Sequence, residues 1–121
     1  PGLIKGAHEG VGLGHRFLRH VERTSILLHV LDCSSEGNQP MTDFRILEHE
    51  LDRYNSELLE RRHVIVLNKT DLIDDARLQE LNDLLRPLGR QVFNISALNG
   101  DGIDELKEYL VEMLDEFRDD Q

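Results

Sequence analysis

The chain has 121 residues, 39% of them hydrophobic, which is enough for one compact domain or part of one. Its net charge of −10 disfavours nucleic-acid backbones as partners, and the sequence offers no direct nucleic-acid site. The single cysteine, Cys33, excludes an internal disulfide and fits a cytoplasmic location, and no apolar run is long enough to predict a membrane span. Because the chain opens on Pro1 without a Met, we expect a fragment or a processed product.

The first half of the chain predicts a loop, two helices and a strand. Residues 1–14 contain five glycines and predict a loop, which a helix over 14–24 follows. The near-continuous apolar run 25–32 predicts a strand that is covered on both faces. An amphipathic helix over 41–52 comes next, and 54–62 is expected to be a connection that docks against the body.

The second half alternates strands with helices. Strands are predicted over 63–67 and 91–95, with a helix that Asp74 or Asp75 caps between them. A final helix is predicted over 103–118, and its apolar face would carry Ile103, Leu106, Leu110, Met113, Leu114 and Phe117. This alternation predicts an α/β fold with a three-layer parallel sheet, which binds ligands at the carboxyl ends of its strands.

The quartet Asn68-Lys69-Thr70-Asp71 directly follows the strand over 63–67. An aspartate carboxylate can accept two parallel hydrogen bonds from the N1–H and N2–H₂ edge of guanine, a donor pair that adenine lacks. The Asn68 amide can both donate and accept, and the Lys69 stem can lie over a flat purine. The quartet therefore predicts a guanine-specific loop. A plain polar loop is the alternative, because N-K-x-D matches by chance at about 1%.

A second polar segment follows the strand over 91–95. The small residues Ser96 and Ala97 would let a backbone N–H approach the guanine O6. A plain turn before a helix would also explain this composition, but the order and spacing relative to Asn68 favour nucleotide binding. Asp32 ends the first strand near the same edge, where capping the following turn is its simpler role.

The opening of the chain resembles a known family. Two stretches, Pro1-Gly2-Leu3-Ile4-Lys5-Gly6-Ala7-His8-Glu9-Gly10 and Phe17-Leu18-Arg19-His20-Val21-Glu22-Arg23-Thr24, are similar to the second switch region and adjoining helix of the Obg family of ribosome-associated GTPases. The resemblance covers nearly the whole chain and implies the carboxyl-terminal half of a P-loop GTPase (G domain) fold. Residues 1–24 would be the second switch loop and helix, and residues 25–121 the guanine-recognition half.

The resemblance also implies roles for individual residues. Pro1 and Gly2 would end a D-x-P-G switch motif whose glycine N–H bonds the γ-phosphate of GTP. The Asp of that motif, which would support Mg²⁺ in the parent protein, would precede this chain. The residues that would contact the guanine of GTP or GDP are Asn68, Lys69, Thr70, Asp71, Ser96, Ala97 and Leu98.

Two departures bear on catalysis. Leu3 stands where Ras-like proteins carry a water-orienting Gln, so slow hydrolysis that depends on other groups is expected. The 121 residues contain no G-x-x-x-x-G-K-[ST] phosphate loop and no first switch. We therefore expect no catalytic residue in this fragment, and weak nucleotide binding or none by the fragment alone. The histidines His8, His15 and His20 lack metal-site spacing, so no metal site is expected.

Two functions remain open at this point. In the first, the parent protein is a GTP-dependent switch and slow GTPase in ribosome assembly, and this chain is its base-binding half. Its partners would be a guanine nucleotide, the missing amino-terminal half of the G domain and, through the parent, a ribosomal particle. In the second, the chain is a non-catalytic interaction module derived from a G domain, which the missing phosphate loop favours. The chain alone would expose an apolar strand edge.

Overall fold

Three parallel strands form one sheet in the part of the chain that the structure describes. The computed structural model describes residues 18–19, 21 and 23–119, with side chains as far as residue 116. Strand β1 (Ile26–Asp32) pairs with β2 (Arg62–Asn68), which pairs with β3 (Gln91–Asn94), so the strand order is the chain order. The strands fall where the sequence predicts them. The loop over 1–14, with Pro1 and Gly2, lies outside the described residues.

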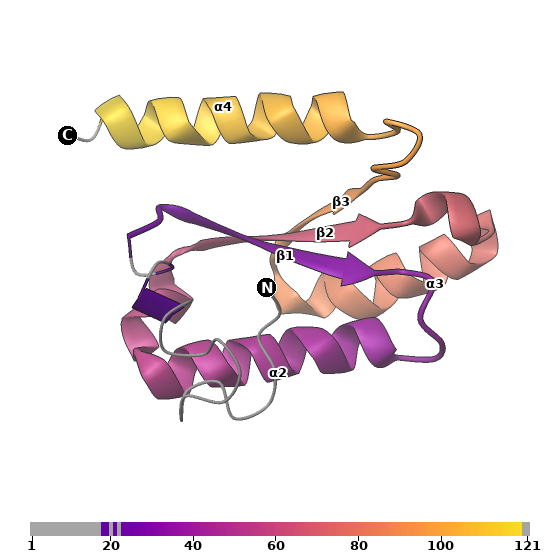
Figure 1. Cartoon of the computed structure of the whole chain (residues 1–121), viewed down its shortest axis with the longest axis horizontal. Helices are drawn as coiled ribbons and strands as arrows, with labels where there is room; N and C mark the ends of the chain where they lie inside the picture. The colour runs from indigo at the N-terminus through magenta and orange to yellow at the C-terminus, as the bar shows by residue number, and fades with distance from the viewer. Residues whose placement is uncertain (1–17, 20, 22, 120–121) are drawn as a thin grey trace.

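The helices cover the two faces of the sheet. Helix α4 (Ile103–Asp119) lies over one face, whereas α2 (Gln39–Tyr54) and α3 (Asp75–Leu85) lie over the other (Figure 1). Since α2 and α3 are also the connections between successive strands, the chain follows the strand–helix–strand course that a parallel sheet requires. The predicted three-layer α/β fold is confirmed.

Local sequence sets where the helices begin. Pro40 lies in the first turn of α2, where its missing N–H costs no hydrogen bond, so this helix starts earlier than predicted and ends at Tyr54. Asp74, one of the two caps considered, begins α3, and its carboxylate accepts from the backbone N–H of Arg77 at 2.8 Å. The connection after α2 contains the 3₁₀ helix η2 (Ser56–Glu60), and its Leu58 is fully buried, as expected of a docked segment.

The core is divided between the two faces. The larger cluster fills the space between the sheet, α2 and α3, and includes Phe44 and the fully buried Cys33. A second cluster, Val64, Val66, Ile95 and Leu106, joins β2 and the end of β3 to α4. A third unites β1, α2 and η2 with the described part of the helix predicted over 14–24, through Leu18, Val21, Leu27, Leu51 and Leu58.

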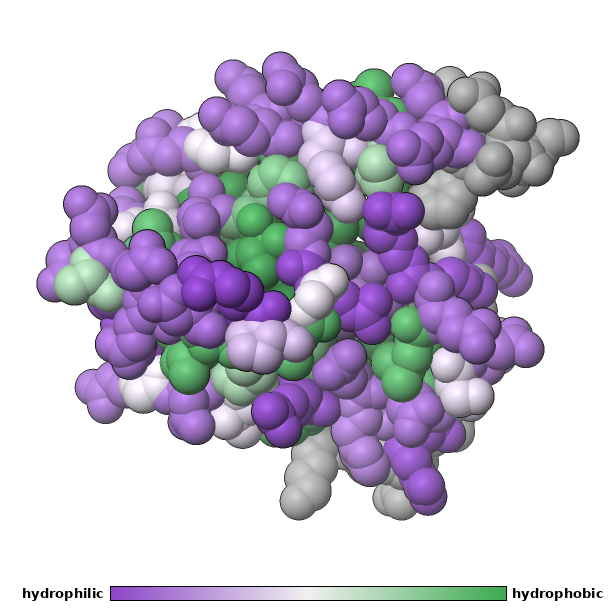
Figure 2. Space-filling model, turned by 180° about the vertical axis from the view of Figure 1, so that it is seen from behind, coloured by the Kyte–Doolittle hydropathy of each residue, from purple (hydrophilic) through white to green (hydrophobic). Residues whose placement is uncertain are grey.

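One prediction about β1 is wrong. Leu28 is 42% exposed and Val30 is 59% exposed, although the apolar run had predicted a strand covered on both faces. The reason is that α4 packs on Val64 and Val66 of β2, so the same face of β1 is left open within the described part of the chain. Leu114, which the helical pattern places on the apolar face of α4, is likewise exposed. From the opposite side, apolar side chains show in the middle of the surface, among mostly polar ones (Figure 2).

The strand register sets the edge where the sheet ends. Asp32 is paired with Asn68, and Leu67 with Asn94, so the three strands finish at nearly the same level. The loops that follow β1, β2 and β3 therefore meet at one edge, which we call the carboxyl edge. The edge where β2 and β3 begin is called the amino edge.

Candidate functional site

The carboxyl edge brings the loop after β2 against the loop after β3. The Ser96 hydroxyl donates to Oδ1 of Asp71 at 2.8 Å, and the backbone N–H of Ala97 donates to Oδ1 of Asn68 at 3.0 Å. These two bonds join residues that are 25 and 29 positions apart in the chain. The two segments that the sequence singled out are thus brought together by side chains of the predicted site itself.

Backbone hydrogen bonds hold the quartet on both sides. The N–H of Thr70 donates to Ile95 O at 3.2 Å, and the N–H of Cys33 donates to Asn68 O at 3.0 Å. A short 3₁₀ helix, η3 (Thr70–Leu72), turns the chain at Asp71. The quartet is therefore fixed by the ends of both neighbouring strands, while the Asp71 side chain stays exposed to solvent.

The loop after β3 is closed by a tight turn that requires glycine. Ser96 is fully buried, its hydroxyl accepts from Asn99 N–H at 3.1 Å, and its own N–H donates to Asp101 O at 3.0 Å. Gly102 has φ +76°, and a Cβ there would stand 2.2 Å from the carbonyl oxygen of Asn94. This close approach sets the loop so that the Ser96 hydroxyl faces Asp71.

Lys69 forms an ion pair that the sequence did not reveal. Its backbone is left-handed, with φ +72°, and its ammonium lies 2.9 Å from Oδ2 of Asp32. Asp32 also caps the turn after β1, as predicted, because Oδ1 accepts from the N–H and hydroxyl of Ser34 at 2.9 Å and 2.5 Å. The hydrogen bond from Lys69, followed by those from Ser34, lowers the pKa of Asp32 to about 2. The same bond to Asp32 raises the pKa of Lys69.

Two polar groups at the carboxyl edge can still form hydrogen bonds with a ligand. Among the described residues, Oδ2 of Asp71 and the amide NH₂ of Asn68 have no hydrogen-bond partner. A carboxylate oxygen and an amide donor can thus face the same ligand, with each side chain already oriented through its other atom. The Ala97 N–H, expected near a base oxygen, is instead occupied by Asn68. Leu98 is 84% exposed beside it.

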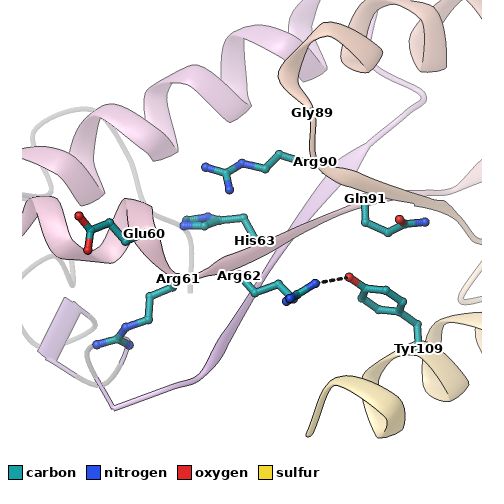
Figure 3. Close-up of a pocket in the computed structure, with 8 residues that line it drawn as sticks. All are labelled: Glu60, Arg61, Arg62, His63, Gly89, Arg90, Gln91 and Tyr109. Atoms are coloured by element: carbon teal, nitrogen blue, oxygen red, sulfur yellow. Dashed lines mark hydrogen bonds between the residues drawn. The ribbon is translucent and has the colours of Figure 1, made fainter. Parts of the chain in front are cut away.

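A hollow of about 440 Å³ lies at the amino edge, opposite this site (Figure 3). Its lining is rich in cationic side chains. Figure 3 shows Arg62 directed toward Tyr109 of α4, whereas Arg61 points away from them and Arg90 lies on the His63 side. The residues that line the hollow are Glu60, Arg61, Arg62, His63, Gly89, Arg90, Gln91 and Tyr109.

The arginines of this hollow bond to the protein itself. Arg61 donates to the carbonyl oxygen of Thr24, and Arg90 donates to Leu59 O at 3.5 Å and lies 3.9 Å from a carboxylate oxygen of Glu48. Arg62 donates to the Tyr109 hydroxyl at 3.5 Å. Because these groups diverge and serve the fold, the hollow does not form a convergent anion site.

Two buried histidines, His29 and His63, lie close to the amino edge. Nε2 of His63 is 2.7 Å from Leu58 O, and Nδ1 of His63 is 2.7 Å from Nε2 of His29. Since a carbonyl only accepts, His63 donates from Nε2 and accepts at Nδ1 from His29, which assigns one neutral tautomer to each ring. Burial, and the charge of Arg90, lower the pKa values of both histidines, that of His29 to about 3.

The described residues contain no group of three or more His, Cys, Asp or Glu side chains placed to hold a metal ion. Nor does this part of the chain contain a helix long and apolar enough to cross a membrane.

Comparison with known proteins gives matches along the chain. The model of the RsgA GTPase family matches residues 34–117. A protein named GTPase Obg from Alkaliphilus metalliredigens is 48% identical over 121 residues, which is 98% of this chain and 28% of that protein. GTPase Obg of Clostridioides difficile is 46% identical over the same shares, and that of Syntrophobacter fumaroxidans is 48% identical over 96% of this chain and 34% of its own length. The chain spans about a third or less of these curated relatives.

Proposed function

Since the chain belongs to the Obg family of GTPases, we propose that its carboxyl edge binds the guanine base of GTP or GDP. The observation that carries this proposal is the way Asn68 and Asp71 are held. Each has one oxygen held by the loop after β3, and each has an atom free of hydrogen-bond partners among the described residues.

Asp71 would read the base in this proposal. Its Oδ1, held by Ser96, and its open Oδ2 would accept from N2–H₂ and N1–H of guanine, and the exposed carboxylate would lose its water only to a ligand that supplies both donors. The Asn68 NH₂ would donate to N7. The N–H of Ala97 would release Oδ1 of Asn68 and donate to O6 of the guanine instead. The exposed Leu98 would cover the base. Thr70 would hold the loop through its backbone.

Phosphate chemistry is assigned elsewhere in this proposal. The 121 residues contain no phosphate loop, and the described residues contain no cluster of carboxylates placed to hold a metal ion, so hydrolysis would depend on residues of the whole protein outside this chain. Residues 25–121 would be the base-recognition half of a G domain, with 1–24 as the second switch, in which Gly2 follows Pro1 at the γ-phosphate. The whole protein would bind and hydrolyse GTP with Mg²⁺ and act in ribosome assembly in the cytoplasm, whereas this chain alone would be inactive.

The uncovered face of β1 supports a further partner. Leu28 and Val30 are exposed on it, and β1 pairs along one edge only within the described sheet. A parallel strand could pair with the open side of β1, and the helix that accompanies this strand could cover Leu28 and Val30. The amino-terminal half of a G domain would supply both. The same surface also favours the second candidate, a non-catalytic module that docks onto another protein through this face.

Titration with GDP and ADP tests the proposal. The protein that carries this segment together with a phosphate-binding loop should prefer GDP on the order of a hundredfold or more, because ADP leaves the Asp71 carboxylate unpaired. The 121-residue chain alone should bind GDP weakly or not at all. Equal affinity for the two nucleotides in the longer protein would refute base recognition by this edge and leave the interaction module as the better account.

A further inference from the structure

An ion pair between Asp32 and Lys69 joins the ends of β1 and β2 beside the candidate base site. Asp32 is the last residue of β1, and Lys69 follows directly after β2, whose last residue, Asn68, is the register partner of Asp32. The pair therefore spans two neighbouring strands at the carboxyl edge. Neither side chain is buried, since the lysine is 50% and the aspartate 39% exposed.

The aspartate is held in place before any ligand arrives. Its Oδ1 accepts two hydrogen bonds from Ser34, which leaves Oδ2 directed to Lys69. The loop that carries Ser34 is braced in turn, because Arg77 of α3 donates to the carbonyl oxygens of Ser35 and Gly37 at 2.9 Å and 2.5 Å. Asp32 is thus a fixed acceptor and not a freely rotating surface carboxylate.

The lysine is fixed at its backbone and would otherwise be free at its tip. Its left-handed φ and the turn of η3 place the Cα beside Asp71. A lysine side chain has several rotatable bonds, and ordering it on a ligand costs conformational entropy. A partner that holds the ammonium in advance removes part of that cost from the binding step.

We propose that Asp32 is a positioning residue for nucleotide binding, which holds the Lys69 stem in the place where it lies against the purine. This inference rests on the proposed function of the carboxyl edge. Asp32 does not touch the base edge in this scheme and acts only through Lys69. It therefore contributes to affinity for any purine nucleotide and not to the choice of guanine, which belongs to Asp71.

The separation of affinity from selectivity gives the test. GDP and inosine diphosphate differ only in the 2-amino group, so the ratio of their affinities reports the Asp71 contact alone. In the nucleotide-binding protein, Asp32→Asn and Lys69→Met should each weaken binding of both nucleotides about two- to fivefold, the effect expected of an exposed ion pair. The ratio should stay at its wild-type value, and Lys69→Met combined with Asp32→Asn should be no weaker than Lys69→Met alone.

Asp83→Asn removes another exposed ion pair, with Arg86, away from the site and should leave both affinities unchanged. The inference is overturned if Asp32→Asn binds GDP as the wild type does, if the two substitutions add, or if the nucleotide ratio changes. A wild-type protein with equal affinity for GDP and ADP would instead overturn the proposed function, and this inference with it.

Discussion

The two ends of the parallel sheet both gather polar side chains, but they use them differently. At the amino edge, Arg61 and Arg90 donate to carbonyl oxygens of the chain, and the buried pair of histidines is satisfied internally. At the carboxyl edge, Asn68 and Asp71 are each held through one atom, and another atom of each has no partner among the described residues.

This difference separates a polar region that supports a fold from one that can bind a ligand. The amino edge contains the hollow and the cationic residues, so shape and charge alone would select it. Its arginines and histidines bond to the protein itself, however, and the arginines diverge, so these cations do not converge on a ligand. The carboxyl edge holds oriented polar groups with atoms that have no partner among the described residues, and such groups are what give a site selectivity.

The largest expected effect is the loss of base selectivity on substitution of Asp71. Asp71→Asn replaces a two-fold acceptor with one acceptor and one donor, so GDP should bind on the order of a hundredfold more weakly and xanthosine diphosphate should become the preferred ligand. Competition titrations with the two nucleotides measure this. Arg62→Ala at the amino edge is the matched control and should change neither affinity by more than about twofold. A stronger effect of Arg62→Ala than of Asp71→Asn would reverse the comparison.

The next effect concerns the backbone that supports the carboxyl edge. Gly102→Ala would place a Cβ 2.2 Å from Asn94 O at φ +76°, and it should destabilise the protein by about 2 to 3 kcal/mol. Gly100→Ala is the control, since its φ is +83° but no atom lies within 4 Å, so only the conformational cost of about 1 kcal/mol is expected. Urea unfolding of both variants gives the difference. Equal losses would show that the close approach to Asn94 has no energetic weight.

The smallest of these effects is a pH dependence that belongs to the amino edge. The pKa of His29 is about 3 in the folded state and 6.5 in the unfolded chain. Between pH 6.5 and pH 3, His29 therefore takes up a proton in the unfolded state and not in the folded state. The resulting stability is fully present above pH 6.5 and is lost as the pH falls toward 3. From pH 7 to pH 5 the loss should be about 2 kcal/mol. His63, whose pKa is also lowered, acts in the same direction.

Unfolding by urea at pH 7 and pH 5 measures this loss. His29→Gln keeps a donor for His63 but cannot titrate, so its stability should fall less over the same range. If His29→Gln loses as much stability as the wild type between the two pH values, the buried histidines do not set the acid sensitivity.

Much of the fold followed from the sequence, for identifiable reasons. Apolar runs ended by polar residues located β2 and β3, and Asp74 located the start of α3, because strand burial and helix capping are local in sequence. The open face of β1 did not follow, because an apolar run does not tell which helix covers which strand. Leu28 and Val30 are exposed because α4, which begins more than seventy residues later in the chain, packs on β2 and leaves them uncovered.

The candidate site shows a similar limit. The sequence singled out the loops after β2 and β3, and it predicted their meeting from the shared end of parallel strands. It did not reveal that Lys69 would pair with Asp32, since that contact depends on register and on a left-handed backbone at a residue other than glycine. The register alone, once known, would have indicated it, because Asp32 and Asn68 are partners. It also did not show that Asn68 would occupy the Ala97 N–H.

Cys33 gives this edge a consequence of another kind. The chain has one thiol, which is fully buried, and burial raises the pKa of that thiol, while its backbone N–H bonds to Asn68. An alkylating reagent attacks the thiolate, so it can react only after a local opening exposes the side chain of Cys33. The rate of labelling, followed by mass spectrometry, therefore reports how often the structure around Cys33 opens. The native sequence needs no added probe for this measurement.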